Sequence, residues 1–254
     1  MITSIHNRRL KEISALISKR KERSRTGLFT AEGVKLFLEA PRELIEDVFV
    51  SASFEADNAS FLENTKYEVV EDSVFLKLCD TDTPQGIITL LKMPSYTRGD
   101  LLGKNPFIMV LENLQDPGNV GTIVRTAEGA GVTGIILSKG CADIFSPKTI
   151  RSTMGSIFRV PFIYEDDIFD AVDWLKENQI HTYGAHLHGV CAYDEPDYTG
   201  GTAFFIGNEG NGLSNELTGQ CDTLIRIPME GKLESLNAAV ASAILMYTVH
   251  SKRN

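Results

Sequence analysis

The apolar positions between residues 8 and 97 form one helical pattern and several short runs. Leu10, Ile13, Leu16 and Ile17 recur at the spacing of one helix face, which predicts a helix near the start of the chain. Short apolar runs follow at residues 28–33, 34–40, 48–51, 67–70, 74–78 and 86–91. Runs of this length, separated by polar residues, are typical of alternating short strands and helices. The pattern predicts a small α/β domain over residues 1–97.

A segment with several Gly and Pro residues, 92–106, interrupts this pattern, and we interpret residues 98–106 as a linker. From residue 107 onwards, apolar strands and amphipathic helices alternate regularly. The expected strands are 107–113, 134–138, 160–164, 180–186, 202–207 and 223–229. The expected helices are 122–131, 148–155, 166–179 and a last helix that opens near residue 235. This alternation predicts an α/β domain over residues 107–254, with a parallel sheet covered by helices.

The composition, with 43% hydrophobic and 23% charged residues in a chain of 254, is that of a globular protein. The longest apolar runs, at residues 108–111 and 238–246, are too short to span a membrane, and residues 1–14 lack the apolar core of a signal peptide. We therefore expect a cytoplasmic protein with no membrane partner. The four cysteines show no CxxC spacing, so we expect reduced structural thiols rather than a zinc site or a disulfide framework.

The charge is distributed unevenly along the chain. The net charge is −9, yet residues 8–25 contain eight basic side chains and only two acidic ones. Such a segment is either a solvated helix face or an element that contacts the phosphates of a nucleic acid. The candidates for RNA contact are Arg9, Lys19, Arg20, Lys21, Arg23 and Arg25.

Two polar segments of the second domain follow apolar runs and precede helices. In residues 111–132, the turn DPGN comes before a helix that carries Arg125, and an ordinary turn with a helix N-cap would also explain it. In residues 227–249, Ser235 and Asn237 open an Ala-rich helix, with Ser235 as a candidate N-cap. Neither segment identifies a function alone.

A third segment, IGNEGNGLS at residues 206–214, raises a chemical question. Glycine lets a backbone approach a ligand closely, as in phosphate-binding loops. However, such loops attract anions with bare N–H groups, so the carboxylate of Glu209 would repel a phosphate. A Rossmann-type nucleotide site is also disfavoured, because its GxGxxG turn follows an early strand, whereas GNEGNG comes late and is spaced differently.

Taken in order, the three segments resemble the motifs of the SpoU, or TrmH-like, RNA 2′-O-ribose methyltransferases, a branch of the knotted SPOUT superfamily. Residues 146–162 are similar to the stretch that this family carries between its first two motifs. Residues 7–36 and 83–87 resemble, more weakly, the L30e-like substrate-binding domain often fused in front. The resemblance implies a catalytic SPOUT domain with a trefoil knot at residues 107–254, preceded by an L30e-like RNA-binding domain at residues 1–97.

The resemblance also implies S-adenosylmethionine as the cofactor, because a cationic sulfonium and an adenosine are compatible with a glycine-rich loop that carries Glu209. Methyl transfer from this sulfonium to a ribose 2′-hydroxyl requires no metal. By carry-over, the cofactor-binding residues are Gly207, Gly210, Ile227, Met229, Leu236 and Asn237. The catalytic residues are Asn119, Arg125, Glu209, Ser235 and Asn237.

Arg125 has the central role in the family account, which makes it the base that deprotonates the hydroxyl. We instead expect Arg125 to hold the phosphate next to the target ribose and to stabilise the developing alkoxide, because arginine stays protonated far above neutral pH. Deprotonation would then occur late, or the proton would pass to Glu209 or to water.

The resemblance carries three further expectations. The last helix is small or apolar on nearly every side from Ala238 to Met246, so we expect a homodimer through the catalytic domain to cover part of it. The two-domain layout favours ribosomal RNA as the substrate; transfer RNA, or a catalytically silent RNA-binding module, are the alternatives. His186 stands where relatives usually have a small hydroxyl residue, either as a solvent-side substitution, which we favour, or as part of the methionine end of the pocket.

Overall fold

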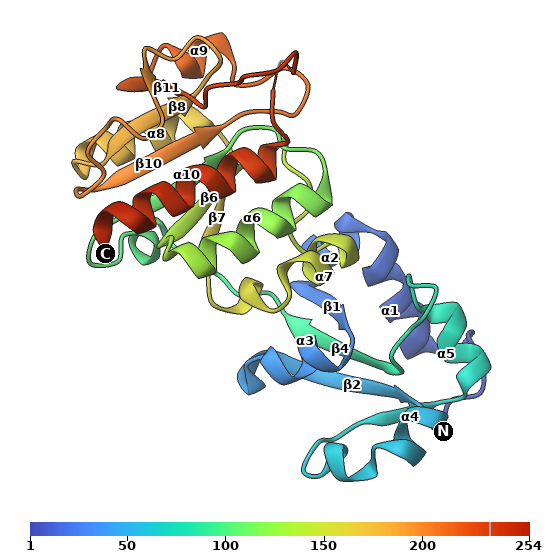
Figure 1. Ribbon diagram of the computed structural model, residues 1–254. Helices are drawn as coiled ribbons and strands as arrows, with labels where there is room; N and C mark the ends of the chain where they lie inside the picture. The colour runs from blue at the N-terminus through green and yellow to red at the C-terminus, as the bar shows by residue number, and fades with distance from the viewer. Residues whose placement is uncertain (234) are drawn as a thin grey trace. The chain divides into compact units, whose positions relative to one another are not determined.

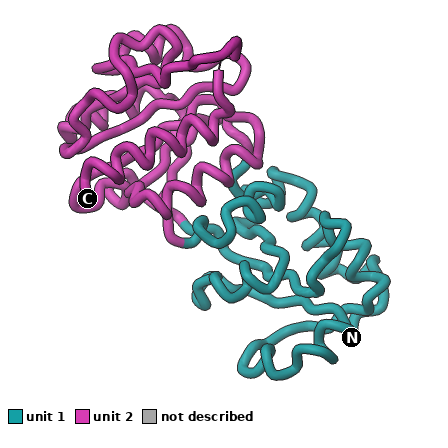
Figure 2. Tube along the Cα trace, viewed as in Figure 1, with its two compact units in different colours: residues 1–94, 143–158 teal, residues 95–142, 159–254 magenta. Residues whose placement is uncertain are grey.

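The computed structural model describes residues 1–233 and 235–254, which divide into two compact units (Figure 2). Unit 1 comprises residues 1–94 and 143–158, and unit 2 comprises residues 95–142 and 159–254. The sequence-based boundaries differ from this division, because they place residues 143–158 with the second half of the chain. They also treat residues 98–106 as a linker, whereas Leu101 is fully buried in the core of unit 2.

Unit 1 contains a four-stranded mixed sheet in the order β1-β4-β2-β3 (Figure 1). β1 and β2 run antiparallel to β4, and β3 runs parallel to β2. The strands are β1 (Leu28–Glu32), β2 (Ile45–Ser51), β3 (Glu68–Val70) and β4 (Ile87–Lys92). The helices are α1 (Arg8–Ser18), α2 (Arg20–Thr26), α3 (Val34–Glu39), α4 (Ala52–Asp57), α5 (Asp72–Leu78) and α7 (Pro147–Thr153), with 3-10 turns at Arg42–Leu44, Ala59–Leu62 and Ser156–Phe158.

Helices cover both faces of this sheet. Side chains alternate between the faces of a strand, so Phe49 of β2 packs with α1 and α5, whereas Val48 and Val50 pack with α4 and the turn after it. The helix predicted from the apolar spacing near the start is α1, and it ends where Lys19 adopts an extended conformation. The sheet thus has two apolar layers, as the short apolar runs of this region require.

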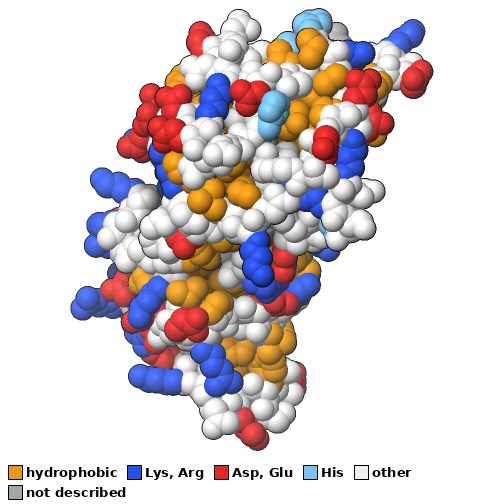
Figure 3. Space-filling view, turned by 90° about the vertical axis from the view of Figure 1, so that its left-hand side faces the viewer, with side chains coloured by type: hydrophobic (Ala, Val, Ile, Leu, Met, Phe, Trp, Pro, Cys, Tyr) orange, Lys and Arg blue, Asp and Glu red, His pale blue; other side chains and the backbone are white. Residues whose placement is uncertain are grey.

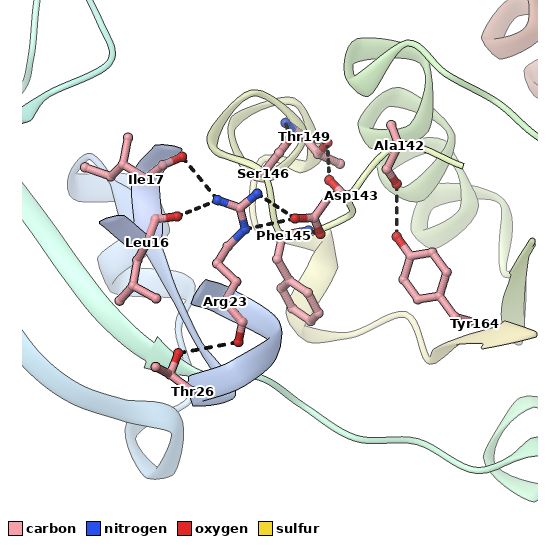
Figure 4. Close-up of polar contacts among 10 residues, drawn as sticks. All are labelled: Leu16, Ile17, Arg23, Thr26, Ala142, Asp143, Phe145, Ser146, Thr149 and Tyr164. Atoms are coloured by element: carbon pink, nitrogen blue, oxygen red, sulfur yellow. Dashed lines mark hydrogen bonds and ion pairs between the residues drawn. The ribbon is translucent and has the colours of Figure 1, made fainter. Parts of the chain in front are cut away.

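One ion pair fastens α7 and its preceding loop to α2 (Figure 4). Arg23 Nε and Nη2 donate to Asp143 Oδ2 at 2.8 and 2.6 Å, and Nη1 donates to the carbonyls of Leu16 and Ile17. The side chains of Arg23 and Asp143 are only 5% and 12% exposed. The prediction that Arg23 contacts RNA is therefore wrong, because its guanidinium is buried and all three of its nitrogens bond within unit 1.

Unit 2 contains a seven-stranded sheet in the order β7-β6-β5-β10-β8-β11-β9, with every neighbouring pair parallel. The strands are β5 (Phe107–Leu111), β6 (Gly134–Ser138), β7 (Phe162–Glu165), β8 (His181–Ala185), β9 (Cys191–Ala192), β10 (Thr202–Ile206) and β11 (Thr223–Arg226). The helices are α6 (Pro117–Ala130), α8 (Ile168–Glu177), α9 (Asn215–Thr218) and α10 (Ala238–Arg253), with a 3-10 turn at Arg98–Leu101. The predicted parallel sheet is confirmed, although β9, a strand of two residues, was not expected.

The sheet of unit 2 lies between two helical layers. Ile108 and Val110 of β5 pack with α8 and α9 on one face, while α6 and α10 lie side by side and α10 contacts β10 (Figure 1). All residues of β5, β6 and β10 are buried, as is usual for parallel strands covered on both faces. The polar residues of a site can therefore gather only beyond the ends of these three strands.

The Arg23–Asp143 pair makes a stability difference that can be measured. We expect Arg23→Met to lower the free energy of unfolding of unit 1 by about 3–5 kcal/mol, because it leaves Asp143 charged, buried and unpaired. Arg25→Met is the matched control: within the described residues Arg25 pairs with Glu22 at the surface, so its removal should cost at most about 1 kcal/mol. Urea unfolding followed by circular dichroism measures both, and equal effects would contradict a structural role for Arg23.

Candidate active site

A cavity of about 280 Å³ opens at the carboxyl end of the unit 2 sheet. Because all the strands are parallel, the segments that follow them meet at this edge, where open α/β sheets bind ligands. The cavity is lined by the end of β8 and the residues after it (185–187), and by the end of β10 and its loop (206–212). The end of β11, the segment that follows it and the start of α10 complete the lining. The structure brings together here the predicted residues Gly207, Gly210, Ile227, Met229 and Leu236, with Glu209 and Ser235.

Two glycines of the loop differ in whether a side chain would fit in their place. A Cβ atom on Gly207 would stand 2.0 Å from the carbonyl carbon of Gly212, so the loop closes on itself only if residue 207 is glycine. The backbones of Asn208 and Gly212 then exchange two hydrogen bonds, at 3.0 and 2.9 Å. A Cβ atom on Gly210 would meet only Asn208 Oδ1, at 3.4 Å. Gly207 thus permits the tight turn, while Gly210 has space for a methyl group.

Glu209 is bonded to the segment that precedes α6. Its carboxylate accepts hydrogen bonds from the backbone N–H groups of Gln115 and Asp116, both at 3.2 Å, and from Asn119 Nδ2 at 3.0 Å. Burial raises the pKa of Glu209, but these hydrogen bonds lower it by more, so that the pKa lies below its ordinary value. A carboxylate whose pKa is lowered and whose oxygens already accept hydrogen bonds is a weaker base, which argues against Glu209 as the group that accepts the proton of the nucleophile.

Asn119 connects Glu209 to the start of α10. Asn237 Nδ2 donates to Asn119 Oδ1 at 2.9 Å, and Asn237 Oδ1 accepts from the backbone N–H groups of Ala239 and Val240. Asn237 is therefore the N-cap of α10, and the interpretation of Ser235 as the N-cap is wrong. Ser235 instead lies exposed at the cavity, two residues before the N-cap of α10. One hydrogen-bonded chain thus joins residues 119, 209 and 237, one from each of the three motif segments.

Arg125 lies exposed on α6, six residues after Asn119, which is a rise of about 9 Å along the helix. Asp116 caps this helix by accepting from the Asn119 N–H at 2.9 Å, and Pro117 occupies its first turn. The Arg125 side chain makes no hydrogen bond or ion pair within the described residues. A guanidinium in this position can receive an anionic or hydroxyl group from outside the protein.

His186 lines the cavity, so the expectation that it is a solvent-side substitution is wrong. The ring atom Nδ1 of His186 accepts a hydrogen bond from the backbone N–H of His188 at 3.2 Å. The backbone N–H of His186 donates to the Ile225 carbonyl at 2.9 Å. With Nδ1 as the acceptor, Nε2 is the ring nitrogen that carries a proton. The imidazole therefore presents a single N–H donor beyond the loop that holds it.

Comparison with known proteins agrees with this geometry. The SpoU rRNA Methylase family matches residues 106–247, more than half of the chain, and an MRM3-like substrate binding domain matches residues 7–89. The chain belongs to the SpoU rRNA methylase family. The resemblance inferred from the three motif segments is thereby confirmed.

Full-length relatives of this SpoU-family chain share both of its units. It is 34% identical to the 23S rRNA (guanosine(2553)-2′-O)-methyltransferase RlmP of Bacillus subtilis (strain 168), over 97% of both chains. It is 30% identical to the 23S rRNA (uridine(2479)-2′-O)-methyltransferase of Streptomyces viridochromogenes, over 99% of this chain and 92% of the other. The crystal structure of the SpoU methyltransferase AviRb from the same organism, in complex with AdoMet, has a TM-score of 0.88 at 28% identity and covers 98% of both chains.

The predicted RNA contacts of this SpoU protein differ in availability. Arg9 is paired with Asp47 and Glu68 and lies over the Phe49 ring, 5.0 Å from its centre. Arg25 is exposed but paired with Glu22, and Lys19, Arg20 and Lys21 are exposed. On the face shown in Figure 3, basic and acidic side chains are likewise mixed. Exposure thus favours Lys19 and Lys21 over Arg9 and Arg23 as phosphate contacts.

Asn208, which follows Gly207, was not among the site residues predicted from the sequence. Asn208 lines the cavity and bonds to the backbone at three points through its side chain. The signal was present, since Asn in a Gly-rich turn commonly bonds to backbone groups two residues on.

The described residues also bear on metal binding, membrane insertion and thiol chemistry. No group of three or more His, Cys, Asp or Glu side chains among them is placed to hold a metal ion. In the same part of the chain, no helix is long and apolar enough to cross a membrane. Burial raises the pKa of Cys79 and Cys221 to about 12, so both thiols stay protonated.

The two glycines give a matched pair of loop variants. We expect Gly207→Ala to weaken S-adenosylmethionine binding by about 10- to 100-fold, because the methyl group forces the turn apart at a cost typical of overpacking. Gly210→Ala should change the affinity by less than about 3-fold, because its methyl group makes only an ordinary contact. Titration calorimetry compares the dissociation constants, and similar effects of both variants would contradict this assignment.

Proposed function

We propose that this protein transfers a methyl group from S-adenosylmethionine to a ribose 2′-hydroxyl in structured ribosomal RNA. The observation that carries the proposal is the hydrogen-bonded chain from Asn237 through Asn119 to Glu209, beside a cavity at the carboxyl edge of the sheet. The family assignment and the relatives that are named as 23S rRNA 2′-O-methyltransferases support it.

The cavity residues are suited to the proposed cofactor. Ile225, Ile227, Leu236 and Leu245 supply apolar surface for an adenine, and the backbone of residues 206–212 supplies donors and acceptors. When bound, S-adenosylmethionine supplies an electrophilic methyl carbon on a cationic sulfur that leaves readily. The negative charge of Glu209 at the cavity suits a cationic ligand and disfavours a phosphate.

The chain's own contribution to the reaction is alignment and electrostatic stabilisation. The hydroxyl nucleophile must be held in line with the methyl carbon, which is an orientation requirement. We assign Arg125 to hold the phosphate next to the target ribose and to stabilise the developing alkoxide with its planar guanidinium. Its exposure and lack of a partner among the described residues support this role, since the guanidinium is free to bind RNA.

Ribosomal RNA is the proposed target class because two relatives aligned over nearly the full chain are named for 23S rRNA positions. Transfer RNA remains the alternative substrate of the same chemistry. A silent RNA-binding module of this fold is disfavoured, because Asn119, Glu209 and Asn237 still form one connected network.

We further propose that unit 2 is the catalytic domain with a trefoil knot, and that unit 1 is an L30e-like RNA-binding domain. The position of β11 supports the knot: it lies between β8 and β9, which are consecutive along the chain. The loop that joins β8 to β9 bonds to β11 through His186 N–H to the Ile225 carbonyl and Val190 N–H to the Leu224 carbonyl, both at 2.9 Å.

A homodimer through unit 2 is proposed from the surface of α10. Val240 and Tyr247 are 49% and 50% exposed and lie seven residues apart, on one face of the helix. A second copy of the chain would cover this apolar face. Light scattering that reports a monomer at micromolar concentration would contradict the dimer.

The function is tested by methyl transfer in vitro. Ribosomal and transfer RNA from cells that lack the gene are incubated with the protein and S-adenosylmethionine, and 2′-O-methyl positions are mapped. A new methylation in ribosomal RNA supports the proposal, and one confined to transfer RNA selects the alternative. A folded protein that binds no S-adenosylmethionine in calorimetry would rule out the enzyme.

Substitution of Arg125 separates its two possible roles. We expect Arg125→Lys to retain cofactor affinity and to lower kcat by roughly 10²- to 10³-fold, since lysine keeps the charge but lacks the planar fork. The ratio of mutant to wild-type rate should stay flat from neutral to alkaline pH. Arg42→Lys, at an exposed arginine of unit 1, is the control and should leave kcat unchanged. A ratio that rises steeply towards the lysine pKa, about 10.4, would indicate that residue 125 is the base.

The exposed lysines of the basic segment have their own test. We expect the double variant Lys19→Gln and Lys21→Gln to weaken RNA binding and to reduce the slope of log affinity against log salt by about 1 for each phosphate group that is no longer bound. Cofactor affinity should not change. The double variant Lys66→Gln and Lys77→Gln removes the same charge elsewhere in unit 1 as a control. Equal salt slopes for the two double variants would make residues 19–21 a solvated face.

A further inference from the structure

The glycine-rich loop after β10 is fastened to the segment after β5 at three successive points. The Ser214 N–H donates to Glu112 Oε2 at 2.8 Å, and Asn208 Nδ2 donates to the Asn113 carbonyl at 2.8 Å. The third point is the Glu209 carboxylate, with the Gln115 and Asp116 amides. β5 and β10 are neighbouring parallel strands, so these contacts continue the pairing of the two strands beyond the sheet.

Asn208 combines one of these bonds with several hydrogen bonds inside the loop. Besides the bond to Asn113, its Oδ1 accepts from the N–H groups of Gly210 and Asn211, at 2.9 and 3.2 Å. Its backbone exchanges two further bonds with Gly212. The side chain therefore ties the tip of the loop to its base and the base to the end of β5.

The group that Asn208 binds is itself held in place. Asn113 adopts a left-handed conformation, with φ of 55°, which turns the chain at the end of β5. Its N–H donates to Ser138 Oγ at 2.9 Å, and its Oδ1 accepts from the same hydroxyl at 3.1 Å. Ser138 is buried at the end of β6. The Asn113 carbonyl is thus a fixed acceptor rather than a mobile loop group.

We infer that Asn208 is a positioning residue for the cofactor site: its side-chain amide holds the backbone of residues 207–212 in the binding conformation before the cofactor arrives. Cofactor binding then requires little further ordering of the loop, which is how preorganisation raises affinity. The same amide sets the place of the adjacent Glu209, and hence of Asn119. The inference rests on the proposed function, because the ligand that this loop meets is the methyl donor.

The test is a titration of the full-length protein with S-adenosylmethionine and, separately, with S-adenosylhomocysteine. We expect Asn208→Ala to raise both dissociation constants by about 10- to 100-fold, since three side-chain hydrogen bonds of ordinary strength are removed. A similar factor for the cationic and the neutral ligand indicates loop geometry, whereas a charge effect through Glu209 would act on the cationic ligand alone. The KM for RNA should not change.

Two further variants keep the test decisive. Asn208→Asp retains the two bonds accepted from Gly210 and Asn211 but cannot donate to the Asn113 carbonyl, so we expect an intermediate reduction of affinity for both ligands. This variant carries the test if Asn208→Ala does not fold. Asn178→Ala is the matched control in unit 2, because it deletes an amide that bonds to the Trp174 carbonyl at 2.8 Å, away from the cavity.

The outcomes separate this inference from the proposed function. Folded variants at residue 208 that bind both ligands as tightly as Asn178→Ala would show that Asn208 has only a structural role and would overturn the inference. An effect confined to kcat, or to the cationic ligand, would overturn it as well. A folded wild-type protein with no affinity for either ligand would overturn the proposed function and this inference with it, whereas wild-type binding with normal variants would overturn the inference alone.

Discussion

The site depends on one carboxylate that is bonded across two loops. Glu209 lies in a glycine-rich turn, yet its hydrogen bonds are made to the backbone before α6 and to the side chain of Asn119. Asn119 in turn accepts from Asn237, which caps α10. Three loops that leave a parallel sheet at separate strands are thereby held in one arrangement. Without this ionised acceptor, the N–H groups of Gln115 and Asp116 would lose their hydrogen-bond partner. The hydrogen bonds that connect the loops to one another would be lost as well.

The sheet explains why polar groups gather at this edge. Its central strands are buried on both faces, so unsatisfied polar groups are tolerated only where strands end. The segments after β5 and β10 then complete one another: carboxylates and carbonyls of one accept from amides of the other. Apolar cover for the cavity comes from β11 and α10, while Arg125 stands on α6 with its charge available.

Unit 1 illustrates how burial changes the meaning of a basic residue. In the sequence, Arg23 is one of eight basic side chains in a short segment, but its guanidinium is enclosed by Asp143 and two helical carbonyls. Arg9 is similarly committed to Asp47 and Glu68. The charge that remains for an RNA comes from exposed side chains such as Lys19 and Lys21. Local charge density alone therefore overstates the phosphate-binding capacity of this segment.

The apolar pattern and the three motif segments were sufficient to predict the α/β class, the parallel sheet, the family and most of the residues that meet at the cavity. They were sufficient because strand and helix periodicity are local properties and the three motif segments each follow a strand. The folded structure was needed to show that Arg23 is buried, that Asn237 rather than Ser235 caps α10, and that His186 lines the cavity. It also placed residues 143–158 with unit 1 and revealed the bonds of Asn208. These features depend largely on contacts between residues far apart along the chain, such as Arg23 and Asp143, and no local pattern of side chains records such contacts.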